Sequence, residues 1–433
     1  MNIIGIRKED KYAMERRVPL TPKHIRKLKQ HHGIDFIIQP SEKRIFKDDE
    51  FEKAGAEIRD ELLQADVIFG IKEIPVSAIM EKKTYIMFSH TIKGQHYNMP
   101  MLKKMMQSGC TLIDYERIID ELGRRLIFFG KFAGIAGMID SLWALGLRLN
   151  HYGIETPFLK IKQSYKYSSL EEAKKEISEV GYEIIQKGLA LDISPIVIGF
   201  TGYGNVSNGA QEICGLLPVK EILASELLSK YPSKSPANII YKVVFKEKDV
   251  VKHIDDGKEF ELEEYFKNPA LYKSDFEKYT NKLTVLINGI YWDERYPRLI
   301  TKNFLHKLYS NSKPKLTVIG DITCDIEGSI ESTIQSTHIE NPLFVYDPFN
   351  HKITMGIEGE GLLTLAVDIL PAELPRDASE FFGDLLFRYI DPIAKADFKG
   401  EYNDIILPQC IKKAIILHKG ILTDDYKYIS KYI

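Results

Sequence analysis

A glycine-rich turn between an apolar run and a helical pattern is the feature that most constrains the fold of this chain. Residues 196–200 form the apolar run, and the turn that follows contains Gly202, Gly204 and, five positions further on, Gly209. A strand, a glycine turn and a helix start make up the part of a βαβ unit where backbone N–H groups can approach a pyrophosphate. The spacing departs from G-x-G-x-x-G, so an ordinary glycine-rich turn is the alternative.

Length, charge and cysteine content narrow the class of protein further. A chain of 433 residues is long enough for two or three domains, and a net charge of −2 without single-sign blocks argues against nucleic acid or an anionic membrane as partner. No uninterrupted apolar run approaches the roughly 18 residues of a transmembrane helix. A strand at 2–6 leaves no room for a signal peptide. The four cysteines are scattered, so we expect free thiols in a cytoplasmic protein and no metal.

Short apolar runs alternate with helical patterns along the chain, which is typical of parallel α/β sheets. In the first 130 residues we expect strands at 3–6, 36–38, 67–71, 85–88 and 111–113. A second series begins at the glycine turn, with strands expected at 196–200, 239–245, 285–287 and 316–319. The remaining segments of this half are predicted as a loop at 230–236 and a charged excursion of helices and turns at 246–282.

A long helical pattern at 133–151 lies between the two series, with apolar residues at every third and fourth position. We interpret it as a bridge between two domains, although an ordinary buried helix fits the periodicity equally well. Later helices are expected at 361–370 and 378–389. The predicted fold is α/β, with two Rossmann-like domains, a cleft between them and a C-terminal segment that returns to the first domain. The substrate domain is expected at 1–132 plus 355–433, and the dinucleotide-binding domain at 133–354.

Ionisable side chains follow the predicted strands of the first domain, at the edge where open α/β sheets bind ligands. The residues brought to this edge are Lys72 and Glu73, His90 and Lys93, and Glu116, with Arg17 after the first strand and Arg125 in a later turn. A single lysine or histidine after a strand is more often a solvated loop residue. The shared edge favours Lys72 and His90 as acid–base groups. Arginines bind carboxylates and glutamates suit amines, so the set predicts an amino-acid dehydrogenase.

Several longer segments carry a family resemblance. In the first domain they are GIRKEDK (5–11), ERRVPLTP (15–22), QPS (39–41), FSHT (88–91) and FGKFAG (129–134). Later segments are GNVS (204–207), GAQE (209–212), LINGIYW (286–292), DI (321–322), GSIE (328–331), LPR (374–376), FGD (382–384) and YKYI (426–429). Over nearly its whole length the chain resembles the lysine–ketoglutarate reductase domain of the aminoadipic semialdehyde synthases, in the alanine dehydrogenase/transhydrogenase superfamily.

The resemblance implies an activity and a set of site residues. The activity is condensation of L-lysine with 2-oxoglutarate and reduction of the imine by NADPH to saccharopine, in a reversible reaction. Lys72 and His90 match the acid–base pair. The matching substrate-pocket residues are Arg17, Glu73, Lys93, Glu116, Arg125 and Phe129. The matching cofactor residues are Gly202, Gly204, Asn205, Gly209, Asn288, Tyr291 and Asp321.

The cofactor preference depends on the residues after the strand at 239–245. A cation there accepts the 2′-phosphate of NADPH, whereas a carboxylate binds the 2′-hydroxyl of NADH, and this chain has Lys246 followed by Glu247. Lys246 favours NADP(H) over NAD(H). Animal and plant family members carry a separate saccharopine-cleaving domain, so we expect a separate cleaving enzyme or none. A homo-oligomer is left open.

Two other functions fit part of the same pattern. An alanine dehydrogenase shares the architecture but uses pyruvate and ammonia, which leaves Glu73, Glu116 and the second arginine without clear partners. A non-catalytic nucleotide-binding regulator would keep the fold, and the joint presence of Lys72, His90 and Arg125 argues against it.

Overall fold

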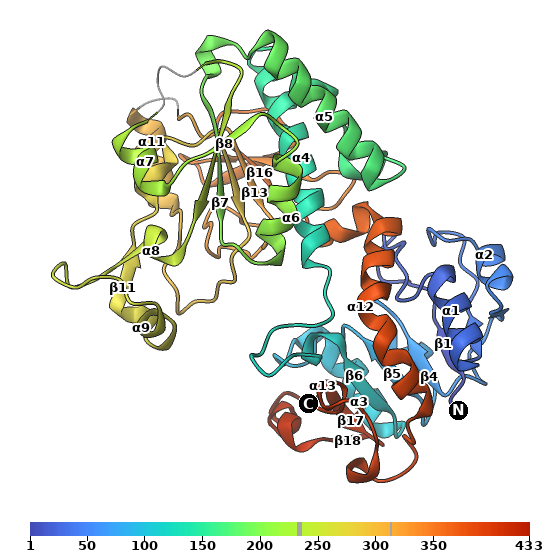
Figure 1. The fold of residues 1–433 in the computed structure, drawn as a ribbon. Helices are drawn as coiled ribbons and strands as arrows, with labels where there is room; N and C mark the ends of the chain where they lie inside the picture. Colours follow the sequence, from blue (N-terminus) through green and yellow to red (C-terminus); the bar gives the residue numbers. More distant parts are fainter. Residues whose placement is uncertain (232–235, 312–313) are drawn as a thin grey trace. The chain divides into compact units, whose positions relative to one another are not determined.

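The computed structural model describes residues 1–231, 236–311 and 314–433, and these form two compact units. Unit 1 contains Met1–Phe129 and Pro375–Ile433, and unit 2 contains Gly130–Leu374 (Figure 1). The chain returns to unit 1 at Pro375, later than the predicted residue 355, because the segment before Pro375 still adds a strand to the sheet of unit 2. Most of the predicted loop at 230–236 lies outside the described residues.

Unit 1 is built on an eight-stranded sheet of order β18-β17-β6-β5-β4-β1-β2-β3. The strands are β1 (Ile4–Ile6), β2 (Phe36–Ile38), β3 (Glu57–Ile58), β4 (Val67–Phe69), β5 (Thr84–Met87), β6 (Thr111–Asp114), β17 (Ile415–His418) and β18 (Ile421–Leu422). β1 to β6 run parallel, whereas β17 pairs antiparallel with β6 and β18. The five strands expected in this region are present within two residues of their predicted ends.

The helices of unit 1 connect these strands in the order expected for a doubly wound sheet. They are α1 (Pro22–His32), α2 (Asp48–Lys53), α3 (Met99–Gln107), α12 (Pro375–Lys395) and α13 (Gln409–Lys412), with short 3₁₀ turns η1 (Val76–Ala78), η2 (His96–Asn98), η3 (Tyr115–Arg117), η9 (Tyr402–Asp404) and η10 (Asp424–Tyr432). β1 lies between β2 and β4, so the strand order runs from β1 to β3 in one direction and from β4 to β6 in the other. Ligands of such sheets bind beyond the carboxyl ends of the strands, at this reversal of strand order.

Unit 2 is built on a second eight-stranded sheet, of order β15-β14-β16-β13-β12-β7-β9-β8. The strands are β7 (Ile196–Thr201), β8 (Val219–Glu221), β9 (Ile240–Phe245), β12 (Val285–Asn288), β13 (Val318–Asp321), β14 (Leu343–Asp347), β15 (Lys352–Met355) and β16 (Leu362–Leu365). β14 is antiparallel to both of its neighbours, and the other pairings are parallel.

The helices of unit 2 are α4 (Gly130–His151), α5 (Leu170–Lys187), α6 (Asn205–Cys214), α7 (Ala224–Ser229), α8 (Glu247–Val250), α9 (Leu262–Lys267), α10 (Glu277–Thr280) and α11 (Lys302–Asn311). The 3₁₀ turns are η4 (Pro157–Lys160), η5 (Ser164–Lys166), η6 (Leu191–Ile193), η7 (Pro269–Leu271) and η8 (Leu370–Glu373). The excursion at 246–282 also contains an antiparallel pair, β10 (Val251–His253) and β11 (Tyr272–Ser274), where helices and turns alone were predicted.

The predicted helix at 361–370 is wrong, because its apolar run forms strand β16. All four residues of β16 are buried, and the strand is paired with β13 on one side and β14 on the other. A short apolar run that is buried on both faces has the composition of a strand and of a core helix alike, and the neighbouring strands decide between them. β13 also begins two residues later than predicted, at Val318.

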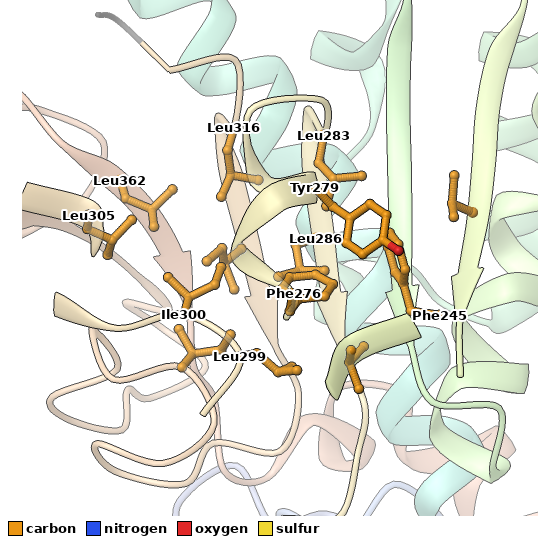
Figure 2. Close-up of a cluster of buried hydrophobic side chains, with 14 of the residues drawn as sticks. Phe245, Phe276, Tyr279, Leu283, Leu286, Leu299, Ile300, Leu305, Leu316 and Leu362 are labelled. Atoms are coloured by element: carbon orange, nitrogen blue, oxygen red, sulfur yellow. The ribbon is translucent and has the colours of Figure 1, made fainter. Parts of the chain in front are cut away.

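Aromatic and aliphatic side chains between Phe276 and Leu283 cover part of the unit 2 sheet. Figure 2 shows Phe276, Tyr279 and Leu283 packed around Phe245 and Leu286. The ring of Phe245 lies 5.0 Å from that of Phe276 and 4.8 Å from that of Tyr279, measured between centroids. These contacts fix the carboxyl end of β9, where Lys246 follows.

Helix α4 has the length and composition of a membrane span, contrary to the expectation that no segment would qualify. Its most apolar window has a mean hydropathy of 1.3, and 83% of that window is buried inside the structure. A Cβ on Gly134 would lie only 1.8 Å from the carbonyl oxygen of Val206 in α6. The apolar face of α4 is therefore packed against protein.

Candidate active site

The glycine turn follows β7 at the point where the strand order of unit 2 reverses. β7 lies between β9 and β12, and α6 begins at Asn205 directly after the turn. Gly202 has a φ of 80°, which glycine adopts without strain, and its N–H donates to the carbonyl of Phe245 at 3.2 Å. The turn is thus held at the carboxyl end of the sheet, where ligands of this fold bind.

Gly204 leaves open space at the start of α6. It caps the ten-residue helix in an extended conformation, no side chain caps the first turn, and a Cβ on it would meet no atom within 4 Å. The first N–H groups of a helix have no partner within the helix and attract an anion. These residues therefore fit the pyrophosphate of a dinucleotide.

Gly209 stands in a different place from the one predicted. It lies inside α6, where a Cβ would stand 2.1 Å from the carbonyl oxygen of Lys131 in α4. Together with Gly134, it lets the two helices approach more closely than any larger residue allows. Gly209 therefore belongs to the packing of α6 on α4, whereas Gly202 and Gly204 form the turn.

Asn288 and Asp321 are buried and bonded to each other at the ends of β12 and β13. The Asn288 amide donates to Asp321 Oδ1 and to Ser329 Oγ, both at 2.8 Å, and its oxygen accepts from Thr201 Oγ1 at 2.8 Å. Burial raises the pKa of Asp321, although hydrogen bonds from Thr333 and Asn288 oppose the shift. Their side chains, together with Thr201, thus connect the ends of β7, β12 and β13 beside the glycine turn.

Lys246, Glu247 and Tyr203 form a polar group beside the glycine turn. The Tyr203 hydroxyl donates to the Glu247 carboxylate at 3.1 and 3.2 Å, and the Lys246 ammonium lies 6.0 Å from the centre of the Tyr203 ring. Glu247 therefore has a donor, whereas the exposed Lys246 ammonium has no carboxylate partner in the described part of the chain. Tyr291 is 73% exposed in the loop after β12, and its hydroxyl donates to Asp293 at 3.3 Å.

In unit 1 the segment that carries Lys72 is tied to the loop after β1. The Glu9 carboxylate accepts the N–H groups of Ile71 at 2.7 Å and of Lys72 at 3.0 Å. Burial lowers the pKa of Lys72 most strongly, the Arg17 charge lowers it further, and Glu15 and Glu73 oppose the shift. A lowered pKa leaves more of the lysine neutral, which favours its use as an acid–base group.

Glu73 is the centre of the hydrogen-bond network at this edge. Its carboxylate, in a side chain only 6% exposed, accepts from Lys11 Nζ at 2.9 Å, from His90 Nδ1 at 2.7 Å and from Asn98 Nδ2 at 2.9 Å. Burial alone would raise the pKa of Glu73, but His90, Asn98 and Lys11 together hold it well below its usual range. Glu73 is therefore ionised and orients His90.

His90 lies in a loop that is held in an unusual conformation. Its φ of 46° is in the left-handed region, which residues with a Cβ adopt only when neighbours hold them there. Asn98 donates to the carbonyls of Ser89 at 3.1 Å and His90 at 3.3 Å. The His90 ring stacks against Phe88, with centroids 6.3 Å apart.

Arg17 is buried beside this network and is already paired. Its guanidinium donates to both oxygens of Glu15, at 2.7 and 2.6 Å, and stacks on the Phe129 ring at 4.2 Å. The Phe129 ring is in turn stacked on Phe382, with centroids 4.3 Å apart. Burial opposes ionisation of Glu15, but Arg17 outweighs it and lowers the Glu15 pKa.

Glu116 and Arg125 form an ion pair at the end of β6. Arg125 donates to Glu116 at 3.0 Å and keeps 54% of its side chain exposed. Asp114, at the end of β6, accepts from the N–H groups of Glu116 at 2.8 Å and Ser89 at 3.1 Å, which links the β5 and β6 loops. Lys93 is exposed on the loop after His90.

The structure thus brings together the predicted residues Lys72, Glu73, His90 and Arg17 and adds partners that were not predicted for the site. These additional residues are Glu9, Lys11, Glu15, Asn98 and Asp114. Glu9, Lys11 and Glu15 lie in the motifs at 5–11 and 15–22, so these motifs could have identified them as site residues. Asn98 and Asp114 carry no such signal, because tertiary contacts alone define their partners.

Two largely parallel Rossmann-like units, one with a glycine turn after its central strand and the other with Lys72, Glu73 and His90 at a strand edge, define the fold class of this chain. Residues 5–136 match the family model "Alanine dehydrogenase/PNT, N-terminal domain". A solved L-alanine dehydrogenase has the same fold, with a TM-score of 0.63 and 16% identity over 99% of this chain and 98% of that one.

Sequence relatives extend over almost the whole chain. An alpha-aminoadipic semialdehyde synthase from Arabidopsis thaliana is 41% identical over 99% of the chain, and the mitochondrial synthase from Rattus norvegicus is 37% identical over 99%. The chain spans less than half of these relatives, 41% and 48% of their lengths. A "Saccharopine dehydrogenase [NAD(+), L-lysine-forming]" from Emericella nidulans is 27% identical over 89% of the chain and 90% of the relative.

The chain is therefore similar over nearly its whole length to one part of the alpha-aminoadipic semialdehyde synthases, and its residues 5–136 match the N-terminal domain of the alanine dehydrogenase/PNT family. This confirms the resemblance drawn from the motifs.

Proposed function

We propose that the chain is an oxidoreductase that condenses L-lysine with 2-oxoglutarate and reduces the imine with NADPH to saccharopine, in a reversible reaction. The observation that carries this proposal is the hydrogen-bonded pair of Glu73 and His90, together with Lys72, whose pKa is lowered by burial and by the Arg17 charge, at the carboxyl edge of the unit 1 sheet. Homology to synthases and to a lysine-forming saccharopine dehydrogenase supports the same reaction class.

Lys72 and His90 exchange the protons of the condensation. The ε-amine of lysine loses a proton before it attacks the keto carbon, and the departing water takes one up. Because burial and Arg17 lower the pKa of Lys72, more of its Nζ is neutral and able to accept a proton. Glu73 holds His90 by Nδ1, which leaves Nε2 to give or take a proton at the substrate.

Charged residues of unit 1 orient the two substrates. Glu116 and the half-exposed Arg125 offer negative charge to an amine and positive charge to a carboxylate, whereas Glu73 and Arg17 are engaged within the protein and act through His90 and Glu15. When bound, the nicotinamide supplies the hydride, and Gly202 and Gly204 leave room for its pyrophosphate beside α6. Holding both substrates in reacting geometry removes much of the entropy cost of the bimolecular step.

A preference for NADPH follows from Lys246. Its exposed ammonium is available for a 2′-phosphate, while the Glu247 carboxylate is engaged by Tyr203. We expect Lys246→Ala to raise KM for NADPH at least five-fold and to leave KM for NADH within two-fold. Glu247→Gln is the matched control. Equal changes for both cofactors in Lys246→Ala would refute the assignment.

The activity is tested by following nucleotide absorbance with lysine plus 2-oxoglutarate and, separately, with pyruvate plus ammonium. Turnover on the first pair, with saccharopine identified by mass spectrometry, is the expected result. Turnover on the second pair alone would identify an alanine dehydrogenase-like enzyme. Nucleotide binding without turnover on any amino-acid and oxoacid pair would identify a regulator.

A further inference from the structure

A segment remote in sequence from the candidate active site contacts two of its loops. This segment, residues 424–432, forms η10 and contains the YKYI motif at 426–429. Tyr426 and Ile429 are 2% and 0% exposed and belong to the hydrophobic core cluster of unit 1. The segment is therefore anchored to the body of the unit by its apolar face.

The first contact is with the turn that carries Glu116. The Tyr426 hydroxyl accepts from Arg117 Nε at 3.0 Å and donates to the carbonyl of Lys413 at 2.9 Å. The Arg117 guanidinium also lies 5.7 Å from the centre of the Tyr426 ring. Because Arg117 follows Glu116 directly in η3, the segment holds the backbone that positions Glu116.

The second contact is with the loop that carries His90. The Tyr428 hydroxyl donates to the carbonyl of Ile92 at 2.8 Å. Gly94 has a φ of 69°, and a Cβ on it would lie 2.4–2.6 Å from the Tyr432 ring, so the ring lies directly against the glycine backbone. Ile92 packs against the same core cluster as Tyr426.

These contacts complete the support of the left-handed conformation at His90. On the strand side, Asn98 binds the carbonyls of Ser89 and His90, and Ser89 is bonded to Asp114. On the far side, Tyr428 and Tyr432 hold residues 92–94. Fixing both sides restricts the imidazole to the position in which Glu73 accepts from Nδ1.

We propose that the segment 424–432 positions His90 for proton transfer, with Tyr428 as the positioning residue. In the described part of the chain, no hydrogen bond or ring contact joins Tyr428 to a predicted substrate or cofactor residue, and Tyr428 acts through the Ile92 carbonyl. The kinetic consequence of this inference rests on the proposed function, whereas the restraint on the His90 loop does not.

The test compares Tyr428→Phe with Tyr402→Phe in the full chain. Both substitutions remove one hydroxyl that donates to a backbone carbonyl in unit 1, and Tyr402 binds Lys412 at 3.3 Å, away from the His90 loop. Hydrogen exchange of amides 92–94 and the NMR signals of isotope-labelled His90 report the loop without any turnover. Kinetics with lysine, 2-oxoglutarate and NADPH report its consequence.

For Tyr428→Phe we expect at least five-fold faster exchange at 92–94, shifted His90 ring signals and a three- to ten-fold lower kcat with KM for NADPH within two-fold. Tyr402→Phe should change none of these. Unchanged exchange and ring signals in Tyr428→Phe would overturn the inference, and so would faster exchange with no greater loss of kcat than in the control. If the wild type has no turnover, the proposed function fails, and exchange and ring signals decide the restraint alone.

Discussion

Replacing Glu73 with glutamine tests the network at the candidate active site while keeping the shape of the side chain. The substitution removes a carboxylate that accepts from Lys11, His90 and Asn98 in a side chain 6% exposed. A hydrogen bond to a charged group contributes about 1.5–3 kcal/mol, against about 0.5–1.5 for a neutral one. The amide therefore loses about 1 kcal/mol at each of Lys11 and His90. Lys11 is 28% exposed, so water recovers part of its share, and we expect a net loss of about 1–2 kcal/mol.

The pH dependence of this loss has a definite sign. Because the folded-state pKa of Glu73 lies below its ordinary value of 4.5, its ionised form stabilises the fold above that pH. This stabilisation disappears as the pH falls through the folded-state pKa. The difference between wild type and Glu73→Gln should therefore be full at pH 7 and shrink in acid.

Hydrogen exchange of peptides from β4 and β5 measures this effect, since both tryptophans, Trp143 and Trp292, lie in unit 2 and do not report on unit 1. Glu57→Gln is the control, because Glu57 is 60% exposed and pairs with Arg59 at the surface. An exposed pair contributes little, so the control should lose less stability than Glu73→Gln. Equal losses in the two variants at pH 7 would refute the assigned role of Glu73.

Three further substitutions test separate parts of the structure. Gly209→Ala should destabilise unit 2 by about 2 kcal/mol or more, because its methyl group overlaps the α4–α6 contact. Gly204→Ala should leave the melting temperature unchanged and weaken NADPH binding. Thermal melts and NADPH titrations distinguish the two variants, and equal melting temperatures would contradict the packing role of Gly209. Asn98→Leu leaves two backbone carbonyls without their donor, so exchange should show a loss of about 2 kcal/mol, and a loss below about 0.5 would contradict the role of Asn98. Burial raises the pKa of Asp140, which is hydrogen-bonded to the buried Glu373, so the proton held by this pair stabilises unit 2 at low pH and that stability falls as pH rises through the raised folded-state pKa. Asp140→Asn should flatten this slope in urea titrations followed by tryptophan fluorescence, and an unchanged slope would refute it.

The sequence predicts well the features that local chemistry determines. The strands before Lys72 and His90 are marked by short apolar runs, and the carboxyl ends of parallel strands meet at one edge, so their side chains were expected together. Gly202 was predicted correctly at the turn because its left-handed φ is a local requirement.

Features that depend on distant neighbours were not predictable in the same way. β16 resembles a core helix in composition, and only its pairing with β13 and β14 makes it a strand. Gly209 follows the turn in sequence, but the carbonyl of Lys131 in another helix accounts for it. Asn98 stands on a connecting turn with no pattern of its own, and Glu73 and the Ser89 carbonyl give it a role.

Proton transfer by Lys72 and His90 is the step on which the proposed activity depends most directly. The measurement is the steady-state rate of Lys72→Met and His90→Gln with lysine, 2-oxoglutarate and NADPH, on preparations whose melting and nucleotide binding match the wild type. General acid–base groups contribute about 10²–10⁴-fold, so each variant should lose at least about 100-fold in kcat. Turnover within a factor of about two of the wild type in both variants would contradict the account.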